Sequence, residues 1–127
     1  MIKVKIAKQS NYPVSGVKIK RELIKTLKEN GLVSNAHVSV AIVNESKMLE
    51  VSKKYKDKKL HNVLSFPFQE KKDNFEYPND GIIRLGDIVV CFPLALEEAK
   101  KENMLIDDKV IELVNHGAMH LLGTHHD

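Results

Sequence analysis

The chain alternates between two hydrophobic periods, and this alternation limits the folds open to it more than any other feature does. Residues 2–6, IKVKI, place an apolar side chain at every second position, which is typical of a half-buried strand. Residues 17–30, VKIKRELIKTLKEN, place apolar side chains on one helical stripe, and Gly31 follows as a suitable C-terminal cap. A strand followed by an amphipathic helix indicates that helices pack against a sheet.

The same two periods account for the rest of the chain. Strands are predicted at residues 37–44, 63–68 and 84–92, and helices at residues 45–55, 93–104 and about 109–122. Pro93 can open a helix, Asp107 and Asp108 suit the start of the last helix, and Gly123 is expected to end it. Residues 70–81 are polar and are expected to form a surface loop. The order β-α-β-α-β-β-α-α predicts an α+β fold, with a small mixed four-stranded sheet packed with about four helices.

Length and composition narrow the class of protein. A chain of 127 residues with 43% hydrophobic and 29% charged residues is expected to form one domain, residues 1–127. Cys91 is the one cysteine and cannot form an internal disulfide, and no apolar run approaches the roughly 18 residues that cross a bilayer. The start, MIKVKIAKQS, lacks the apolar core of a signal peptide. We therefore expect a cytoplasmic protein without a membrane partner.

Positive charge is concentrated in one segment. The formal net charge is +3, and residues 47–59, KMLEVSKKYKDKK, hold six lysines against one glutamate and one aspartate. Such a cluster can neutralise phosphates and attract a polyanion, although a solvated helix face has the same composition. The cluster alone leaves both interpretations open.

The C-terminal residues HGAMHLLGTHHD contain four histidines in a pattern that suits a metal ion. His116 and His120 are four residues apart, so their imidazoles lie on one helical face within reach of one cation. With a turn at Gly123, His126 is expected to return as a third ligand, and three imidazoles with an open fourth position are typical of catalytic zinc. His125 is the nearest competitor for the third position. The alternative to a metal site is a set of histidine cations at a helix C-terminus.

The spacing H-x-x-x-H-x-x-G-x-x-H is shared with the metzincin peptidases, but Gly117 stands where those enzymes have their general-base glutamate. A peptidase mechanism therefore lacks its base. Glu112, one turn before His116, is a candidate for the base or for orienting a ligand, although an ion pair with Lys109 is the more common role at this spacing. Asp87 is a second candidate to hydrogen-bond a metal-bound histidine.

Three segments, in the same order, resemble one known family. HGAMHLLGTHHD resembles the signature HGxLHLxGyDH of the YbeY family. NVLSFPF (62–68) is similar to that family's T-[DN]-V-L-S-F-P segment, and LGDIVVC (85–91) is similar to its L-G-D-[IV]-x-I-[CS] strand. The resemblance covers about residues 38–127 and implies kinship with bacterial endoribonucleases implicated in rRNA maturation and ribosome quality control.

Carried over residue by residue, the resemblance implies that His116, His120 and His126 bind one zinc ion per chain and that the first two take part in catalysis. Lys56 occupies the position of the family's arginine after a tyrosine. This match implies a catalytic role in stabilising charge on the phosphate, although lysine lacks the bidentate guanidinium. His61 stands where the family usually has threonine, and His125 stands where it usually has aspartate.

The function implied by the resemblance is that of a zinc-dependent, single-strand-specific endoribonuclease. Its expected partners are rRNA or an rRNA precursor and the small ribosomal subunit, in maturation of the rRNA 3′ end and in ribosome quality control. Attack by a zinc-activated water and attack by the ribose 2′-hydroxyl are both chemically open. The alternative function is a ribosome assembly factor that binds rRNA, with a mainly structural metal and little nuclease activity. No dinucleotide cofactor is expected.

Overall fold

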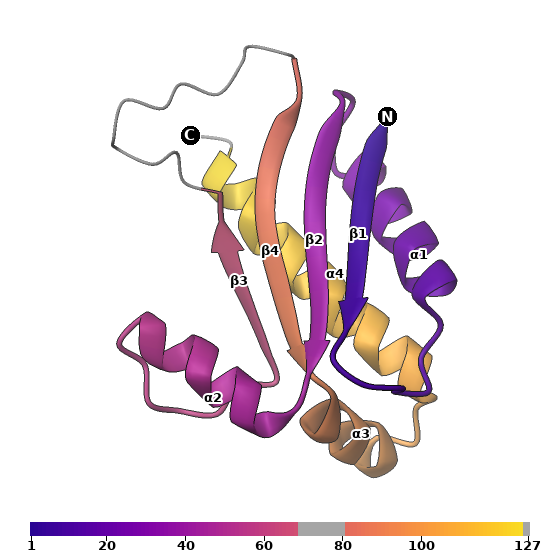
Figure 1. Ribbon diagram of the computed structural model, residues 1–127. Helices are drawn as coiled ribbons and strands as arrows, with labels where there is room; N and C mark the ends of the chain where they lie inside the picture. The colour runs from indigo at the N-terminus through magenta and orange to yellow at the C-terminus, as the bar shows by residue number, and fades with distance from the viewer. Residues whose placement is uncertain (69–80, 126–127) are drawn as a thin grey trace.

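The fold is described for residues 1–68 and 81–125 in a computed structural model, and for residue 125 by its backbone alone (Figure 1). The strands are β1 (Ile2–Lys8), β2 (Ala36–Val43), β3 (Val63–Pro67) and β4 (Ile83–Cys91), and the helices are α1 (Gly16–Glu29), α2 (Glu45–Lys54), α3 (Phe92–Lys101) and α4 (Ile106–His125). Their order confirms the predicted succession of elements and the α+β class.

The described strands form one mixed sheet in the order β1-β2-β4-β3. β1, β2 and β4 run parallel, whereas β3 pairs antiparallel with β4, from Val63 opposite Val90 to Pro67 opposite Gly86. β3 therefore forms an edge of this sheet and ends at Pro67, a residue that cannot donate a backbone hydrogen bond. This edge lies beside α4, with which β3 is in contact.

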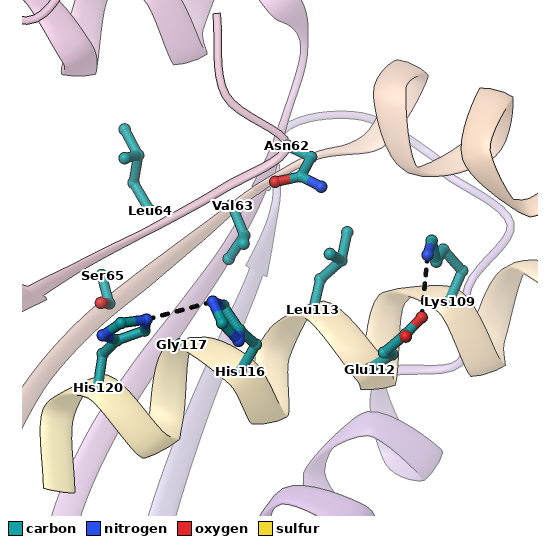
Figure 2. A pocket seen from close by; sticks show the side chains of 10 residues that line it. All are labelled: Asn62, Val63, Leu64, Ser65, Lys109, Glu112, Leu113, His116, Gly117 and His120. Atoms are coloured by element: carbon teal, nitrogen blue, oxygen red, sulfur yellow. Dashed lines mark hydrogen bonds and ion pairs between the residues drawn. The ribbon is translucent and has the colours of Figure 1, made fainter. Parts of the chain in front are cut away.

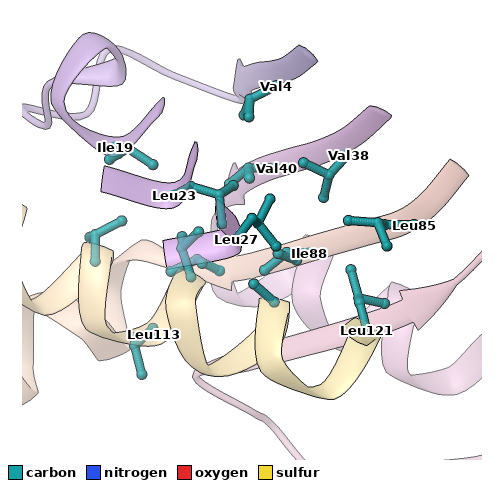
Figure 3. Packing of buried hydrophobic residues seen from close by; sticks show 14 of the residues in the cluster. Val4, Ile19, Leu23, Leu27, Val38, Val40, Leu85, Ile88, Leu113 and Leu121 are labelled. Carbon is teal, nitrogen blue, oxygen red and sulfur yellow. The ribbon is translucent and has the colours of Figure 1, made fainter. Parts of the chain in front are cut away.

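The main hydrophobic core lies between one face of the sheet and helices α1 and α4 (Figure 3). Val38 and Val40 alternate along β2 and point toward this core, as the strand period predicts. Leu23 and Leu27 of the predicted α1 stripe are buried against them, and α4 contributes a row of apolar residues that includes Leu121. Because burial of apolar surface favours the folded state, this core fixes α4 along the sheet.

Helix α2 covers part of the opposite face of the sheet (Figure 1). Met48 of α2 is fully buried there beside Val89 and Cys91 of β4. Burial raises the pKa of the Cys91 thiol, which disfavours the reactive thiolate. Cys91 is therefore a core residue.

A β-bulge in β4 decides which of its side chains reach the main core. The register between β2 and β4 shifts between His37 and Val38. As a result, Leu85 and Ile88 are three residues apart and yet both are buried in the same core, a spacing that regular alternation does not give. Gly86 lies between them with a φ of 138°, and a Cβ at this position would collide with the backbone of β3. Only glycine fits at this point.

The last helix is longer than predicted at both ends, although the predicted place of Asp107 and Asp108 at its start is confirmed. It begins at Ile106, so that Asp107 and Asp108 lie in its first turn. The expectation that Gly123 ends this helix is wrong, because α4 continues through it to His125. Thr124 Oγ1 donates a hydrogen bond to the carbonyl oxygen of His120 at 2.7 Å, which keeps this turn closed. The left-handed conformation that ends a helix occurs instead at Gly31, after α1, as predicted.

Two further expectations can be compared with the described residues. The predicted surface loop at 70–81 lies outside them except for Gly81, so its structure stays a prediction. Within the described part of the chain, none of the helices combines the length and the apolar character needed to cross a membrane.

Candidate metal centre in the cleft between β3 and α4

A cleft of about 470 Å³ lies between the edge strand β3 and the side of α4 that faces it (Figure 2). One wall consists of residues 62–65, and the other consists of Lys109, Glu112, Leu113, His116, Gly117 and His120. The cleft exists because the apolar stripe of α4 packs on the sheet centre, whereas its polar side chains project beside the short edge strand.

The two helical histidines point toward each other within this cleft (Figure 2). The Nε2 atoms of His116 and His120 lie 3.2 Å apart, and the ring planes are inclined by 80°. A tetrahedral zinc ion with zinc–nitrogen bonds of about 2.0–2.1 Å separates two ligand nitrogens by roughly 3.3 Å. The pair therefore fits two positions of one zinc ion with little rearrangement. The sequence spacing predicted this juxtaposition.

The third predicted ligand, His126, lies outside the described residues, and no side chain is described for His125. Within residues 1–68 and 81–124, no group of three histidine, cysteine or acidic side chains is arranged to hold a metal ion. The zinc site with three histidines therefore stays a prediction, of which the described residues show two donors.

Gly117 packs α4 closely against the sheet. It is buried, and a Cβ at this position would lie 2.9 Å from Cγ2 of Ile88, which is itself fully buried in β4. A separation under 3 Å requires something to move, and a β-branched side chain fixed in a strand core has little freedom to do so. Residue 117, which corresponds to the general-base glutamate of the metzincins, therefore faces the sheet in this protein. Its glycine has a packing role.

Lys109 forms a second polar group in the cleft. Its side chain is 7% exposed, and its Nζ lies 2.8 Å from Glu102 Oε2 and 2.9 Å from Glu112 Oε2. Hydrogen bonds to Glu102 and then to Glu112 raise the pKa of Lys109 above its ordinary value near 10.5. The expected pairing of Glu112 with Lys109 is confirmed. Sequence spacing did not reveal Glu102, because it reaches Lys109 from the end of α3 across the connection between the helices.

Lys56 lies just after α2 and is exposed. It is absent from the described residues that line the histidine cleft, so its catalytic role stays a prediction. His61, near the start of β3, places its Nε2 2.6 Å from Asp57 Oδ2. The backbone N–H of Lys59 and the His61 ring both hold the pKa of Asp57 below its ordinary value. His61 and Asp57 thus fix the connection between α2 and β3.

Asp87 lies on the wrong side of the sheet to orient a metal-bound histidine. It lines a groove on the face opposite α4, together with Tyr55 and Phe66. Its neighbour Ile88 faces α4, and successive side chains along a strand point to opposite faces. The interpretation of Asp87 as a hydrogen-bond partner of the histidine pair is therefore wrong.

The fold and the cleft define a class: a small α+β protein in which paired imidazoles occupy a cleft beside the edge of a mixed sheet. A family model described as Endoribonuclease YbeY matches residues 5–127. The chain belongs to the YbeY family, as its three sequence segments predicted.

Individual relatives agree with this assignment. The chain is similar to Endoribonuclease YbeY of Macrococcus caseolyticus, with 34% identity over 85% of this chain and 70% of the relative. It is also similar to Endoribonuclease YbeY of Persephonella marina, with 30% identity over 87% of this chain and 69% of the relative. The solution structure of a Thermotoga maritima protein has a TM-score of 0.57 and 25% identity, over 93% of this chain and 71% of that one.

Proposed function

We propose that this protein is a zinc-dependent, single-strand-specific endoribonuclease of the cytoplasm. In this proposal it acts on small-subunit rRNA or its precursor, in maturation of the rRNA 3′ end and in ribosome quality control. The observation that carries the proposal is the convergence of His116 and His120 Nε2 atoms in an open cleft, in a chain whose relatives are described as endoribonucleases.

The histidines have a clear chemical role in this proposal. His116 and His120, with His126 as the third ligand, would hold zinc on the cleft side of α4. When bound, zinc supplies Lewis-acid chemistry, which polarises a phosphodiester and makes water a better nucleophile. The packing of Gly117 on Ile88 sets the height of α4 above the sheet and so helps to position both rings.

The size of the cleft favours a single strand. A volume of about 470 Å³ is in the range of pockets for small ligands, which suits part of one strand and not both strands of a duplex. A duplex would present both backbones and stacked base pairs to the same opening. Lys56 would stabilise negative charge on a phosphate if the RNA chain extends past the end of α2.

The proposal is tested by comparing His116→Ala with Met119→Ala, a change at an exposed residue of the same helix. In protein without a histidine tag, we expect about one zinc ion per wild-type chain and almost none in His116→Ala, because an imidazole ligand is lost. Cleavage of a labelled single-stranded RNA should fall by at least about 10-fold to 100-fold, the loss that follows even when only a hydrogen-bond partner of a ligand is removed. The Met119→Ala protein should keep both its zinc and its activity.

The outcomes separate this proposal from the alternative function. A wild-type protein that binds zinc but cleaves no RNA, together with a His116→Ala protein that unfolds, would favour an assembly factor with a structural metal. The ends of the product identify the nucleophile. A 2′,3′-cyclic phosphate and a 5′-hydroxyl indicate attack by the ribose 2′-hydroxyl, whereas their absence in early products indicates attack by water.

A further inference from the structure

A second concave surface lies on the sheet face opposite the histidine cleft. This groove has a volume of about 380 Å³, and its lining residues come from strands β1, β2 and β4, from the end of β3 and from the C-terminal part of α2. The described residues that line it include Lys5, Ser39, Lys54, Tyr55, Phe66 and Asp87. We refer to this surface as the sheet groove.

The charged side chains of the sheet groove come from three elements. Lys5 alternates with buried Val4 along β1 and therefore points away from the main core. Lys54 ends α2 and is exposed. Asp87 is the one carboxylate among the described lining residues. The groove thus carries two cations and one anion, and Lys3 adds a further exposed cation on the same face of β1.

An aromatic side chain is held at the wall of the sheet groove. The Tyr55 ring stacks on Phe66 with centroids 4.2 Å apart and planes inclined by 19°. Phe66 in turn packs against the buried cluster beneath α2. Tyr55 is nevertheless 61% exposed, so one ring face is supported and the other is open to solvent. Such a ring offers a flat surface for a nucleobase with little loss of conformational freedom on binding.

The edge strand β3 connects this groove to the histidine cleft. Ser65 lines the cleft, and the next residue, Phe66, lines the sheet groove. Consecutive side chains of a strand point to opposite faces, and β3 is only Val63–Pro67 long. A single polynucleotide strand that passes around this short edge could therefore contact both surfaces.

We infer that the sheet groove binds a stretch of single-stranded RNA that flanks the segment held in the histidine cleft. Lys5 and Lys54 pair with phosphates, and Tyr55 stacks on a base. Because every base has an aromatic face, this contact tolerates many sequences. The inference rests on the proposed function, since it assumes an RNA substrate.

The test measures RNA binding to the zinc-loaded protein by fluorescence anisotropy at low temperature, and gel electrophoresis after each reading confirms that the RNA is still intact. The probe is a labelled single-stranded RNA of about 12 nucleotides, compared with one of about four nucleotides that is too short to span both surfaces. For the longer RNA, Tyr55→Ala should weaken affinity by roughly 5-fold to 100-fold, because a stacking contact is lost. Tyr55→Phe should bind within about twofold of wild type, because it keeps the ring.

The charge contacts have a matched control. Lys5→Ala/Lys54→Ala should weaken binding of the longer RNA and reduce the slope of log affinity against log salt by about 1.4, the value for two phosphate contacts on a single strand. Lys20→Ala/Lys25→Ala removes the same charge from exposed positions of α1, which covers the other face of the sheet. This control should leave the slope unchanged.

The possible results are distinguishable. Groove variants that bind the longer RNA as tightly as wild type, with an unchanged salt slope, overturn the inference even if the protein cleaves RNA. The inference is also overturned if Lys5→Ala/Lys54→Ala and Lys20→Ala/Lys25→Ala reduce RNA affinity equally. Equal effects would indicate a general attraction between the protein's positive charge and RNA. If the wild-type protein binds neither RNA, the proposed endoribonuclease function fails together with the inference.

Discussion

At the scale of single residues, two glycines have roles that their sequence neighbours do not suggest. Gly117 belongs to a histidine signature and Gly86 to a strand motif, yet both allow close approach between elements. At Gly117 the neighbour is Ile88, and at Gly86 it is the backbone of β3. Residue 117 therefore lacks the metzincin base, and it also lies too close to the sheet for a larger side chain to fit without overpacking.

Gly117→Ala should lower the free energy of unfolding by about 1 kcal/mol. Overpacking against Ile88 costs roughly 1–3 kcal/mol, and the better helix propensity of alanine offsets about 1 kcal/mol of this cost. Gly123→Ala is the matched control, because it lies in the same helix with nothing within 4 Å of the added Cβ. Urea denaturation should show that the control is as stable as wild type or more stable. Equal stabilisation by both changes would contradict the packing role.

At the scale of elements, three helices end in the same hydrogen-bonded motif. After α1, α2 and α3 the chain turns through a residue with positive φ, namely Gly31, Lys56 and Asn103. At α2, the backbone N–H of Lys56 donates to the carbonyl of Lys53 and that of Asp57 donates to the carbonyl of Ser52. Glycine and asparagine accept this conformation readily, whereas lysine does so at a cost. Lys56 therefore occupies a position where glycine would be more stable.

Lys56→Gly should raise the free energy of unfolding by up to about 1 kcal/mol, because it relieves the left-handed strain. If Lys56 contributes to catalysis, the same variant should cleave RNA more slowly. Stability is measured by chemical denaturation, and activity is measured on the single-stranded RNA used for His116→Ala. A variant that is more stable and equally active would remove Lys56 from the proposed catalytic residues.

At the scale of the whole molecule, the Lys109 ion pairs join the end of α3 to α4 and couple global stability to pH. The pKa of Lys109 is raised in the folded protein, so the folded state binds this proton more tightly than the unfolded state. The resulting stabilisation is fully present below the unfolded pKa, near 10.5, and is lost as the pH rises from there through the folded pKa.

Lys109→Met should therefore lower the free energy of unfolding by about 1 kcal/mol at neutral pH, since it loses two charged hydrogen bonds but keeps the buried stem. The difference from wild type should stay constant from about pH 7 to pH 10 and become smaller above that range. Denaturation of both proteins across this range provides the measurement. A difference that widens at high pH would show that the ion pairs are not its source.

The sequence by itself determined the order of the elements, the α+β class and the pairing of His116 with His120. These features depend on the spacing of apolar residues and of histidines over a few positions, and this spacing can be seen directly in the sequence. The sequence did not determine where the last helix ends, because a glycine such as Gly123 is compatible both with a cap and with a continuing helix. The tertiary structure decided which it is: α4 continues to His125.

The tertiary structure also decided which side chains share a surface. A bulge beside Gly86 puts Leu85 and Ile88 in one core and leaves Asp87 on the far face, away from the histidine pair. The contact of Glu102 with Lys109 depends on how α3 meets α4. Such contacts join residues from different elements. They depend on the register between strands and on how closely helices pack, and the local periodicity of a sequence specifies neither.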